Sequence, residues 1–362
     1  MDKSTILRTF LSLGAQVDKD ALDILVANQE VLERALKTEK NKLPSVITSE
    51  FLKTLSQIAL PTEKISVNQL SLVLNYRYEF LRKILAGKTE LTNLISMNKV
   101  SEKLKQFSVI GVVVSKTDIL TLEDSTGQAG FLVDKESARY VIEDEVIGIV
   151  CERRGETNHV KSIVYPDIPL RKEASKYENL KNCIFISDIH MDSPKFDENH
   201  YKNLLNWLEE QKDLKIFVIG GISKKRDDIT RFLSDVPTPL QIYSEETISK
   251  SLISAKVENI QIAVTYGTFL QYYMNLWSTP ASTTLLNLIK KRNLNPVITP
   301  DFYDNAFLLE NIPDILVVGG TGKAETANYK GTTILTNGGF LTEPIYWLIN
   351  LRTRETFKID FS

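Results

Sequence analysis

Residues 183–196 read Cys-Ile-Phe-Ile-Ser-Asp-Ile-His-Met-Asp-Ser-Pro-Lys-Phe and decide how the second half of the chain folds. The apolar run at the start of this stretch predicts a strand that is buried on both faces. Directly beyond it come Asp188 and His190, two residue types that bind metal ions. The two other histidines, His159 and His200, do not follow such a strand. The sequence therefore predicts a candidate site at the carboxyl end of this strand.

An Asp-x-His motif directly after a buried strand is typical of the opening of a two-metal phosphoesterase. That chemistry holds two cations about 3.5–4 Å apart, bound by a bridging carboxylate and several imidazoles. Three histidines in the whole chain are too few for this set of ligands. The motif therefore favours a phosphoesterase fold that keeps its first motif and has lost its chemistry.

The composition is that of an ordinary globular protein of two or three domains. The chain has 362 residues, 43% of them apolar, which is enough for a sizeable core. Lys and Arg number 44 against 46 acidic residues, so a protein that coats nucleic acid is not expected, and any DNA contact would be local or made through a partner. Cys151 and Cys183 have neither a metal-type nor a disulfide-type spacing. No apolar run approaches the roughly 18 residues of a membrane span, so we expect a soluble intracellular protein.

Residues 1–42 are predicted to form a small helical module. The apolar residues from Ile6 to Leu13 lie on one helical stripe that Gly14 ends, Asp18 can cap a second helix, and residues 31–36 predict a third. A module of this size is marginally stable alone and is typical of a docking unit.

Residues 43–96 are interpreted as a helical connector. Residues 51–58 suggest a helical turn or two, and Leu70 through Leu85 predicts a helix that Gly87 ends.

Residues 97–170 change to short runs rich in β-forming residues. The five predicted strands, with a helical interruption at Lys135–Ile142, match an OB-type barrel. They cover Phe107–Val114, Ile119–Glu123, Ala129–Val133, Asp144–Cys151 and His159–Val164. Such barrels bind single strands through aromatic platforms, and these strands are mainly aliphatic. Direct nucleic-acid binding and a structural or protein-binding role both remain open for this barrel.

Residues 171–362 alternate strands, loops and helices. The pattern indicates a layered sheet covered by helices, closed by a hairpin over Pro344–Leu351 and Thr356–Asp360. The predicted fold class is therefore an α+β multidomain protein with a helical module, an OB-type β-barrel and a layered α/β domain. Chemistry in such a domain is expected at the carboxyl ends of the strands.

Three stretches carry a resemblance to a known family. They are Ile142–Gly148 with Val164–Pro169 in the barrel, Phe185–His190 at the strand end, and Asn293–Pro296 through Pro313–Gly319. In this order they resemble the small subunit of archaeal D-family DNA polymerase, which is related to the B subunits of eukaryotic replicative polymerases. The resemblance implies a calcineurin-like phosphoesterase domain behind the barrel.

Active members of that family resemble Mn²⁺-dependent 3′ to 5′ exonucleases, and the resemblance implies where their ligands would lie here. Asp188 and His190 match the first motif, whereas Gly221 stands at the position where the family has its bridging carboxylate. Tyr266 stands at the position of the histidine in the family's His-Gly turn. Gly320 and Gly322 stand at the positions of the two histidines in its Gly-His-x-His turn. No Gly-Asn-His occurs, and the corresponding region is near Gln241–Glu246.

These departures predict a vestigial metal motif at Asp188 and His190, with no catalytic residue, no bound metal and no cofactor. Glycine offers no side-chain ligand, so two cations would repel each other without shielding. One cation on Asp188, His190 and Asp192 is conceivable, although so few ligands would hold it weakly.

The favoured function is a non-catalytic accessory subunit that scaffolds the large catalytic subunit of a replicative DNA polymerase. DNA would be met indirectly through the complex, other replisome proteins could bind the N-terminal helices, and no membrane is involved. The expected location is the cytoplasm, in association with the nucleoid. One alternative is a metal-dependent 3′ to 5′ exonuclease that uses Asp188 and His190, and another is a free single-strand-binding protein that uses the barrel.

Three further features were weighed. Lys224–Asp228 favours a solvated helix start over a binding patch, and Gly319–Lys323 lacks the spacing of a phosphate-binding loop. Aromatic residues between Tyr266 and Phe307 predict a mixture of core and interface side chains.

Overall fold

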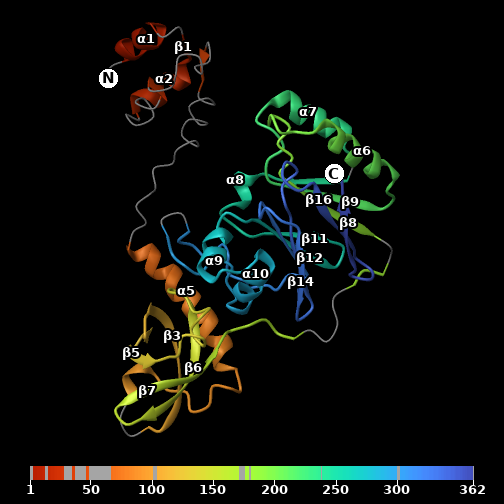
Figure 1. The fold of residues 1–362 in the computed structure, drawn as a ribbon. Coiled ribbons are helices and arrows are strands. Elements are labelled where there is room, and N and C mark those ends of the chain that lie inside the picture. Colours follow the sequence, from red (N-terminus) through yellow and green to blue (C-terminus); the bar gives the residue numbers. More distant parts are fainter. Residues whose placement is uncertain are drawn as a thin grey trace. The chain divides into compact units, whose positions relative to one another are not determined.

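The structure is a computed structural model that describes most of the chain. The described residues are 3–12, 15–27, 35–36, 46–48, 67–100, 104–170, 176–178, 181–237, 239–299 and 302–361. The chain divides into two compact units, Met1–Val67 and Asn68–Ser362 (Figure 1). None of the helices described is long and apolar enough to cross a membrane.

Among the described residues, the first unit contains the helices α1 and α2 and a two-stranded parallel sheet, which share one small core. Ile6 and Phe10 pack against Ala21, Leu25 and Ile47, all of them fully buried. The helices α1 and α2 lie where the sequence predicts helices, whereas the sheet was not predicted, and one of its strands lies beyond residue 42. Most of the predicted helix over 31–36 lies outside the described residues. The predicted helical turns over 51–58 lie entirely outside them. The elements are α1 (Lys3–Ser12), β1 (Gln16–Val17), α2 (Lys19–Ala27) and β2 (Val46–Ile47).

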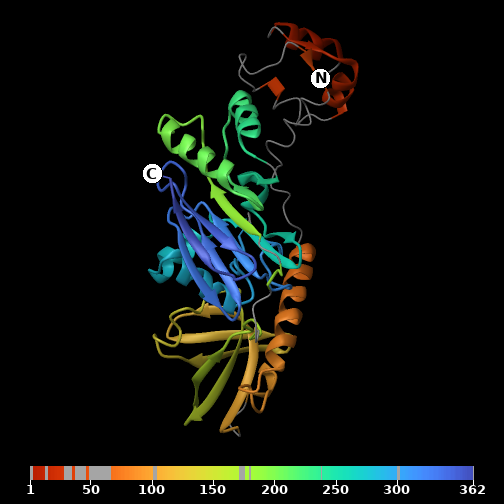
Figure 2. The same cartoon turned by 90° about the vertical axis from the view of Figure 1, so that its right-hand side faces the viewer.

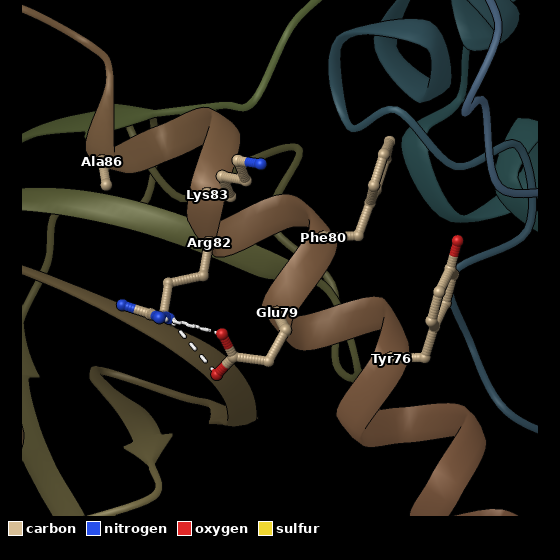
Figure 3. Close-up of a pocket in the computed structure, with 6 residues that line it drawn as sticks. All are labelled: Tyr76, Glu79, Phe80, Arg82, Lys83 and Ala86. Carbon is tan, nitrogen blue, oxygen red and sulfur yellow. Dashed lines mark hydrogen bonds and ion pairs between the residues drawn. The ribbon is translucent and has the colours of Figure 1, made fainter.

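The second unit begins within the long helix α5 (Val67–Ala86). The helix ends just before Gly87, as the sequence predicts, because the Gly87 amide donates to the carbonyl of Ile84, three residues back, at 3.2 Å and not to the carbonyl four residues back. Its buried residues Leu81 and Leu85 lie in one apolar cluster with residues of both the barrel and the layered domain. Figure 3 shows Tyr76 and Phe80 on the side of α5 that faces the layered domain. The helix therefore braces the two following domains. It is joined to the barrel through η2 (Met97–Lys99).

The barrel is closed and five-stranded, in the order β3-β4-β5-β7-β6, and its strands lie where the sequence predicts them. Its buried residues are mainly aliphatic, with Phe107 and Phe131 as the buried aromatic side chains. The strands are β3 (Gln106–Lys116), β4 (Ile119–Asp124), β5 (Gly127–Leu132), β6 (Val146–Arg154) and β7 (Thr157–Val164).

The predicted helical interruption at Lys135–Ile142 is wrong. This segment forms consecutive turns instead of a helix. Asp134 accepts a hydrogen bond from the Ser137 amide at 2.8 Å, and the Lys116 ammonium binds the carbonyls of Ala138 and Val141 at 3.0 and 2.8 Å. The Asp134 bond is one that a helix N-cap would also make, so the distinguishing contact is that of Lys116, which ties this turn segment to the end of β3.

The layered domain contains two five-stranded mixed sheets, in the orders β10-β9-β8-β16-β17 and β11-β12-β13-β15-β14. The strands of the first sheet are β8 (Asn182–Ser187), β9 (Leu214–Ile219), β10 (Leu240–Tyr243), β16 (Ile345–Asn350) and β17 (Thr356–Asp360). Those of the second are β11 (Ile253–Val257), β12 (Ile260–Tyr266), β13 (Ile315–Gly319), β14 (Glu325–Tyr329) and β15 (Thr332–Thr336). The predicted closing hairpin is confirmed as β16 and β17, which pair antiparallel.

The two sheets pack face to face with helices on both outer faces (Figures 1 and 2). Phe185 and Phe217 of the first sheet share a buried cluster with Val264 and Val317 of the second. Both faces of β8 are therefore covered, as its apolar run predicts. The helices are α6 (Glu198–Glu210) and α7 (Arg226–Asp235) on the first sheet, α9 (Leu270–Trp277) and α10 (Ala281–Lys290) on the second, and the short α8 (Glu245–Ile248).

The barrel and the layered domain meet in a tight junction. The Lys291 ammonium lies 2.5 Å from the Glu145 carboxylate, with both side chains almost fully buried, and also donates to the Tyr140 carbonyl at 2.7 Å. Burial raises the pKa of the Glu145 carboxyl, and Lys291 opposes that shift. The strap after β7 is fixed as well, because the Asp167 amide donates to the Lys290 carbonyl at 2.7 Å.

Candidate functional site

Asp188 and His190 lie at the carboxyl end of β8, where the sequence places them. Both have a left-handed backbone, with φ of 54° and 45°. The Asp188 amide donates to the Ile219 carbonyl at 3.0 Å, and the His190 amide to the Gly221 carbonyl at 3.1 Å. The loop after β8 is thus fastened to the loop after the parallel neighbour β9, which brings Gly221 beside the motif.

Tyr266 joins this site from the end of β12 in the other sheet. Its hydroxyl donates to Asp188 Oδ1 at 2.9 Å, while His190 Nε2 lies 3.7 Å from the same oxygen. Asp188 is only 5% exposed, and burial raises the pKa of its carboxyl to about 6 despite the hydrogen bond from Tyr266. Burial also raises the pKa of the Tyr266 hydroxyl, with the nearby Asp188 carboxylate as the next cause. The tyrosine therefore remains a hydrogen-bond donor to a carboxyl that is costly to ionise.

Three glycines of the site, Gly220, Gly221 and Gly320, leave no room for larger side chains. A Cβ on Gly221 would lie 2.3 Å from His190 Cε1, and one on Gly320 would lie 2.3 Å from Tyr266 Cζ. Gly220 is equally confined, because its Cβ would meet Asp188 Oδ1 at 2.2 Å. The His190 and Tyr266 rings thus fill the space into which side chains at positions 221 and 320 would extend.

The remaining predicted positions do not add ligands. Gly322 has a φ of +80° and open space around it, and the region near Gln241–Glu246 supplies the end of β10 and the start of α8. Among the residues that the structure describes, no three His, Cys, Asp or Glu side chains are placed to hold a metal ion together. Asp192 therefore does not complete a cation site with Asp188 and His190. His159 and His200 lie on β7 and α6.

Sequence reasoning missed several polar residues buried around this strand end. Asn337 is fully buried, and its side-chain amide donates to the Phe185 carbonyl at 2.8 Å, which ties the end of β15 to β8. The Asn337 Oδ1, Ser187 Oγ and Tyr346 hydroxyl atoms have no hydrogen-bond partner there. The Gly-Gly that follows Asn337 is a local sequence sign of a close approach at this strand end.

Comparison with known proteins was made at the level of families, sequences and structures. No family model matches the chain. The DNA polymerase II small subunit of Archaeoglobus fulgidus is 25% identical over 252 residues, covering 58% of this chain and 51% of that protein. The protein of the same name from Pyrococcus furiosus is 32% identical over 154 residues, covering 38% of this chain and 25% of that protein. The one from Methanothermobacter thermautotrophicus is 22% identical over 349 residues, covering 74% of this chain and 72% of that protein.

The chain is related to the archaeal DNA polymerase II small subunits. This confirms the family resemblance seen in the sequence. The chain spans about half the length of the Archaeoglobus and Thermoplasma relatives that it matches.

Solved structures show a weaker likeness. A Vps29 mutant from Entamoeba histolytica is 14% identical, with a TM-score of 0.33, and covers 50% of this chain and 99% of that one. A predicted phosphoesterase from Streptococcus pneumoniae is 12% identical, with a TM-score of 0.33, and covers 51% of this chain and 92% of that one. The architecture described above rests on the strand order of the chain itself.

The two barrel stretches that carry the family resemblance, Ile142–Gly148 and Val164–Pro169, both contact the layered domain. In the first stretch, Glu145 forms an ion pair with Lys291, and Asp144 accepts a hydrogen bond from the Ile298 amide at 3.0 Å. Asp167 in the strap binds the Lys330 ammonium and the Tyr329 hydroxyl at 2.5 and 2.9 Å. These residues therefore join the barrel to the layered domain.

Proposed function

We propose that this chain is a non-catalytic small subunit of a replicative DNA polymerase, which scaffolds the large catalytic subunit on its barrel and layered domain. The observation that carries the proposal is the match to five archaeal small subunits. By their name, these relatives assemble with another subunit.

The state of the strand-end site supports the absence of catalysis. Asp188 and His190 are the vestige of a metal motif, and Gly221, Tyr266, Gly320 and Gly322 are its degenerate positions. The Tyr266 hydroxyl donates a hydrogen bond to one oxygen of Asp188, and the His190 ring fills the space above Gly221. Without a bridging carboxylate and further imidazoles, two cations at this site would repel each other without shielding.

The finer domain assignments belong to the same proposal. The strand order β3-β4-β5-β7-β6 supports an OB-type barrel over 97–170. The Asp-x-His motif and the glycine turns at the strand ends support an inactivated, calcineurin-like phosphoesterase domain over 171–362. Residues 1–42, together with β2 from beyond them, would form a recruitment module for other replisome proteins, and the rest of 43–96 a connector. DNA would be met through the complex, at the nucleoid.

Affinity purification of the tagged chain from its native cells tests the assembly. A large polymerase chain is expected to co-purify in stoichiometric amount, and its absence would contradict the proposal.

A nuclease assay on the purified chain with Mn²⁺ tests the missing chemistry. No cleavage is expected. Metal-dependent cleavage that is abolished in His190→Ala would establish the exonuclease alternative instead.

A further inference from the structure

The outer face of α9 carries no charge. Residues 259–289 contain no charged side chain, although 25% of the chain is charged. Tyr272 and Leu276 are 55% and 49% exposed on this face. Beside them Gln271 donates to Asn275 at 2.9 Å, so the two exposed amides partly satisfy each other. A surface poor in charge and rich in aromatic side chains is typical of the core of a protein interface.

A cavity of about 250 Å³ opens beside this face. The Tyr273 hydroxyl in its wall donates to Asn295 Oδ1 at 2.6 Å and accepts from the Val297 amide at 3.3 Å. These polar atoms are already paired, so the cavity offers mainly aromatic and aliphatic surface to a side chain that enters it. Its walls include Phe269, Tyr272, Tyr273, Asn295, Val297 and Phe302.

The cavity is built on fixed elements. The Phe269 ring packs on the buried Phe307 with centroids 4.8 Å apart. The opposite wall belongs to a segment that Arg77 of α5 holds through the carbonyls of Pro296 and Asp304, at 2.7 and 2.9 Å. A preformed pocket of this kind orders little on binding, which is the property of an interface hot spot.

The hollow along α5 differs in kind. It measures about 460 Å³ and is lined by Glu79, Arg82 and Lys83 as well as by Tyr76 and Phe80 (Figure 3). Glu79 and Arg82 pair with each other at 2.8 Å and are half-exposed, so this hollow is a solvated surface.

We propose that the outer face of α9 and its cavity dock an uncharged segment of a partner polypeptide, which inserts one leucine or aromatic side chain into the cavity. This inference rests on the proposed function, since the partner is then the large polymerase subunit. A charged segment would bury its charge against a face without a counter-ion. A nucleic acid would find no Lys or Arg on this face to meet its phosphates.

The test uses the full chain together with the large polymerase subunit of the same genome. Tyr272→Asp and Leu276→Asp place a charge on the docking face, and each is expected to weaken assembly at least about tenfold, as measured by titration of the purified subunits. Tyr272→Phe keeps the aromatic ring and is expected to bind like the parent. Leu233→Asp on α7 is the matched control, because Leu233 is 50% exposed on another face.

The outcomes separate this inference from the proposed function. If the parent chain binds and both aspartate variants bind equally well, the docking face is wrong and the proposed function stands. If the parent chain does not bind the large subunit, both fail. A dimer of the chain alone that Tyr272→Asp dissolves would assign the face to a second copy and overturn the inference. Thermal unfolding of each variant verifies that the exposed substitutions leave the fold intact.

Discussion

Lys291 and Glu145 form a buried ion pair, 2.5 Å apart, between the layered domain and the barrel. The Lys291 ammonium also lies 4.3 Å from the centroid of the Tyr165 ring. Every partner of this ammonium other than Trp277 belongs to the barrel or the strap that follows it. The pair therefore fixes how one domain sits on the other.

Removing one partner of this pair is expected to be more harmful than removing both. Lys291→Met leaves the Glu145 carboxylate buried without a counter-ion, and the expected loss is about 3–5 kcal/mol of unfolding free energy. Adding Glu145→Leu is expected to restore most of it, since no charge is then left buried. Urea unfolding of the three variants measures this. Lys181→Met, from the more exposed pair with Glu258, serves as the control, with a change below about 1 kcal/mol. A Lys291→Met variant as stable as the parent would contradict the prediction.

Arg77→Lys is expected to loosen α5 from the layered domain. The guanidinium binds the Pro296 and Asp304 carbonyls and Asn305 Oδ1, the last at 3.0 Å, and an ammonium cannot reproduce this fork. A loss of about 3 kcal/mol and faster amide exchange in α5 are expected. Arg82→Lys on the same helix faces solvent and should change neither quantity; equal effects of the two substitutions would exclude the bracing role.

Asp188→Asn is expected to stabilise the protein in a pH-dependent way. The folded carboxyl has a pKa of about 6 against an ordinary 3.8, so the folded state binds this proton more tightly than the unfolded state. Ionisation therefore costs stability, from nothing below about pH 4 to the full amount, on the order of 3 kcal/mol, above pH 6. The variant should gain that amount at pH 7.5 and almost nothing at pH 4, in urea unfolding at both values.

Asp197→Asn is the control for this trend. The backbone amides of Asn199 and His200 lower the pKa of the Asp197 carboxyl at the start of α6. Its charge therefore stabilises the folded state, and that stability is lost as the pH falls. If Asp188→Asn changes the unfolding free energy equally at both pH values, burial does not penalise the Asp188 charge.

Gly320→Ala tests the packing of the strand-end site. The new Cβ would overlap the Tyr266 ring, with an expected cost of roughly 1–3 kcal/mol beyond the strain of its left-handed backbone. Gly322→Ala has the same kind of backbone and open space, so it reports the strain alone, about 1 kcal/mol. In a Tyr266→Ala background the difference between the two glycine substitutions should vanish. If it persists, Tyr266 does not fill the site as described.

Local patterns predicted the individual elements better than their contacts. The apolar run of β8, the aliphatic barrel strands and the helix ended by Gly87 are set by residues close in sequence, and all three were predicted. The four-residue helix α8 and the five-residue strand β11 were missed, because they are too short for a periodic pattern to be recognised. At 135–142 the local pattern predicted a helix, and the segment forms turns whose carbonyls at Ala138 and Val141 are bound by Lys116 from β3.

The site was predicted in its residue types and not in its geometry. The family resemblance pointed to Gly221 and Gly320, but the rings of His190 and Tyr266 that fill the space above them come from other strands. Asn337 and the Glu145–Lys291 pair depend on segments far apart in the sequence, and no local pattern predicts such contacts.

The ring of Tyr266 over Gly320 bears on evolution as well as on packing. A ligand residue introduced at position 320 would collide with that ring, and one at position 221 would collide with His190. Each single substitution that adds a ligand side chain at these positions would thus harm folding before it could help to bind a cation. Packing therefore opposes any change toward a cation site here, one residue at a time.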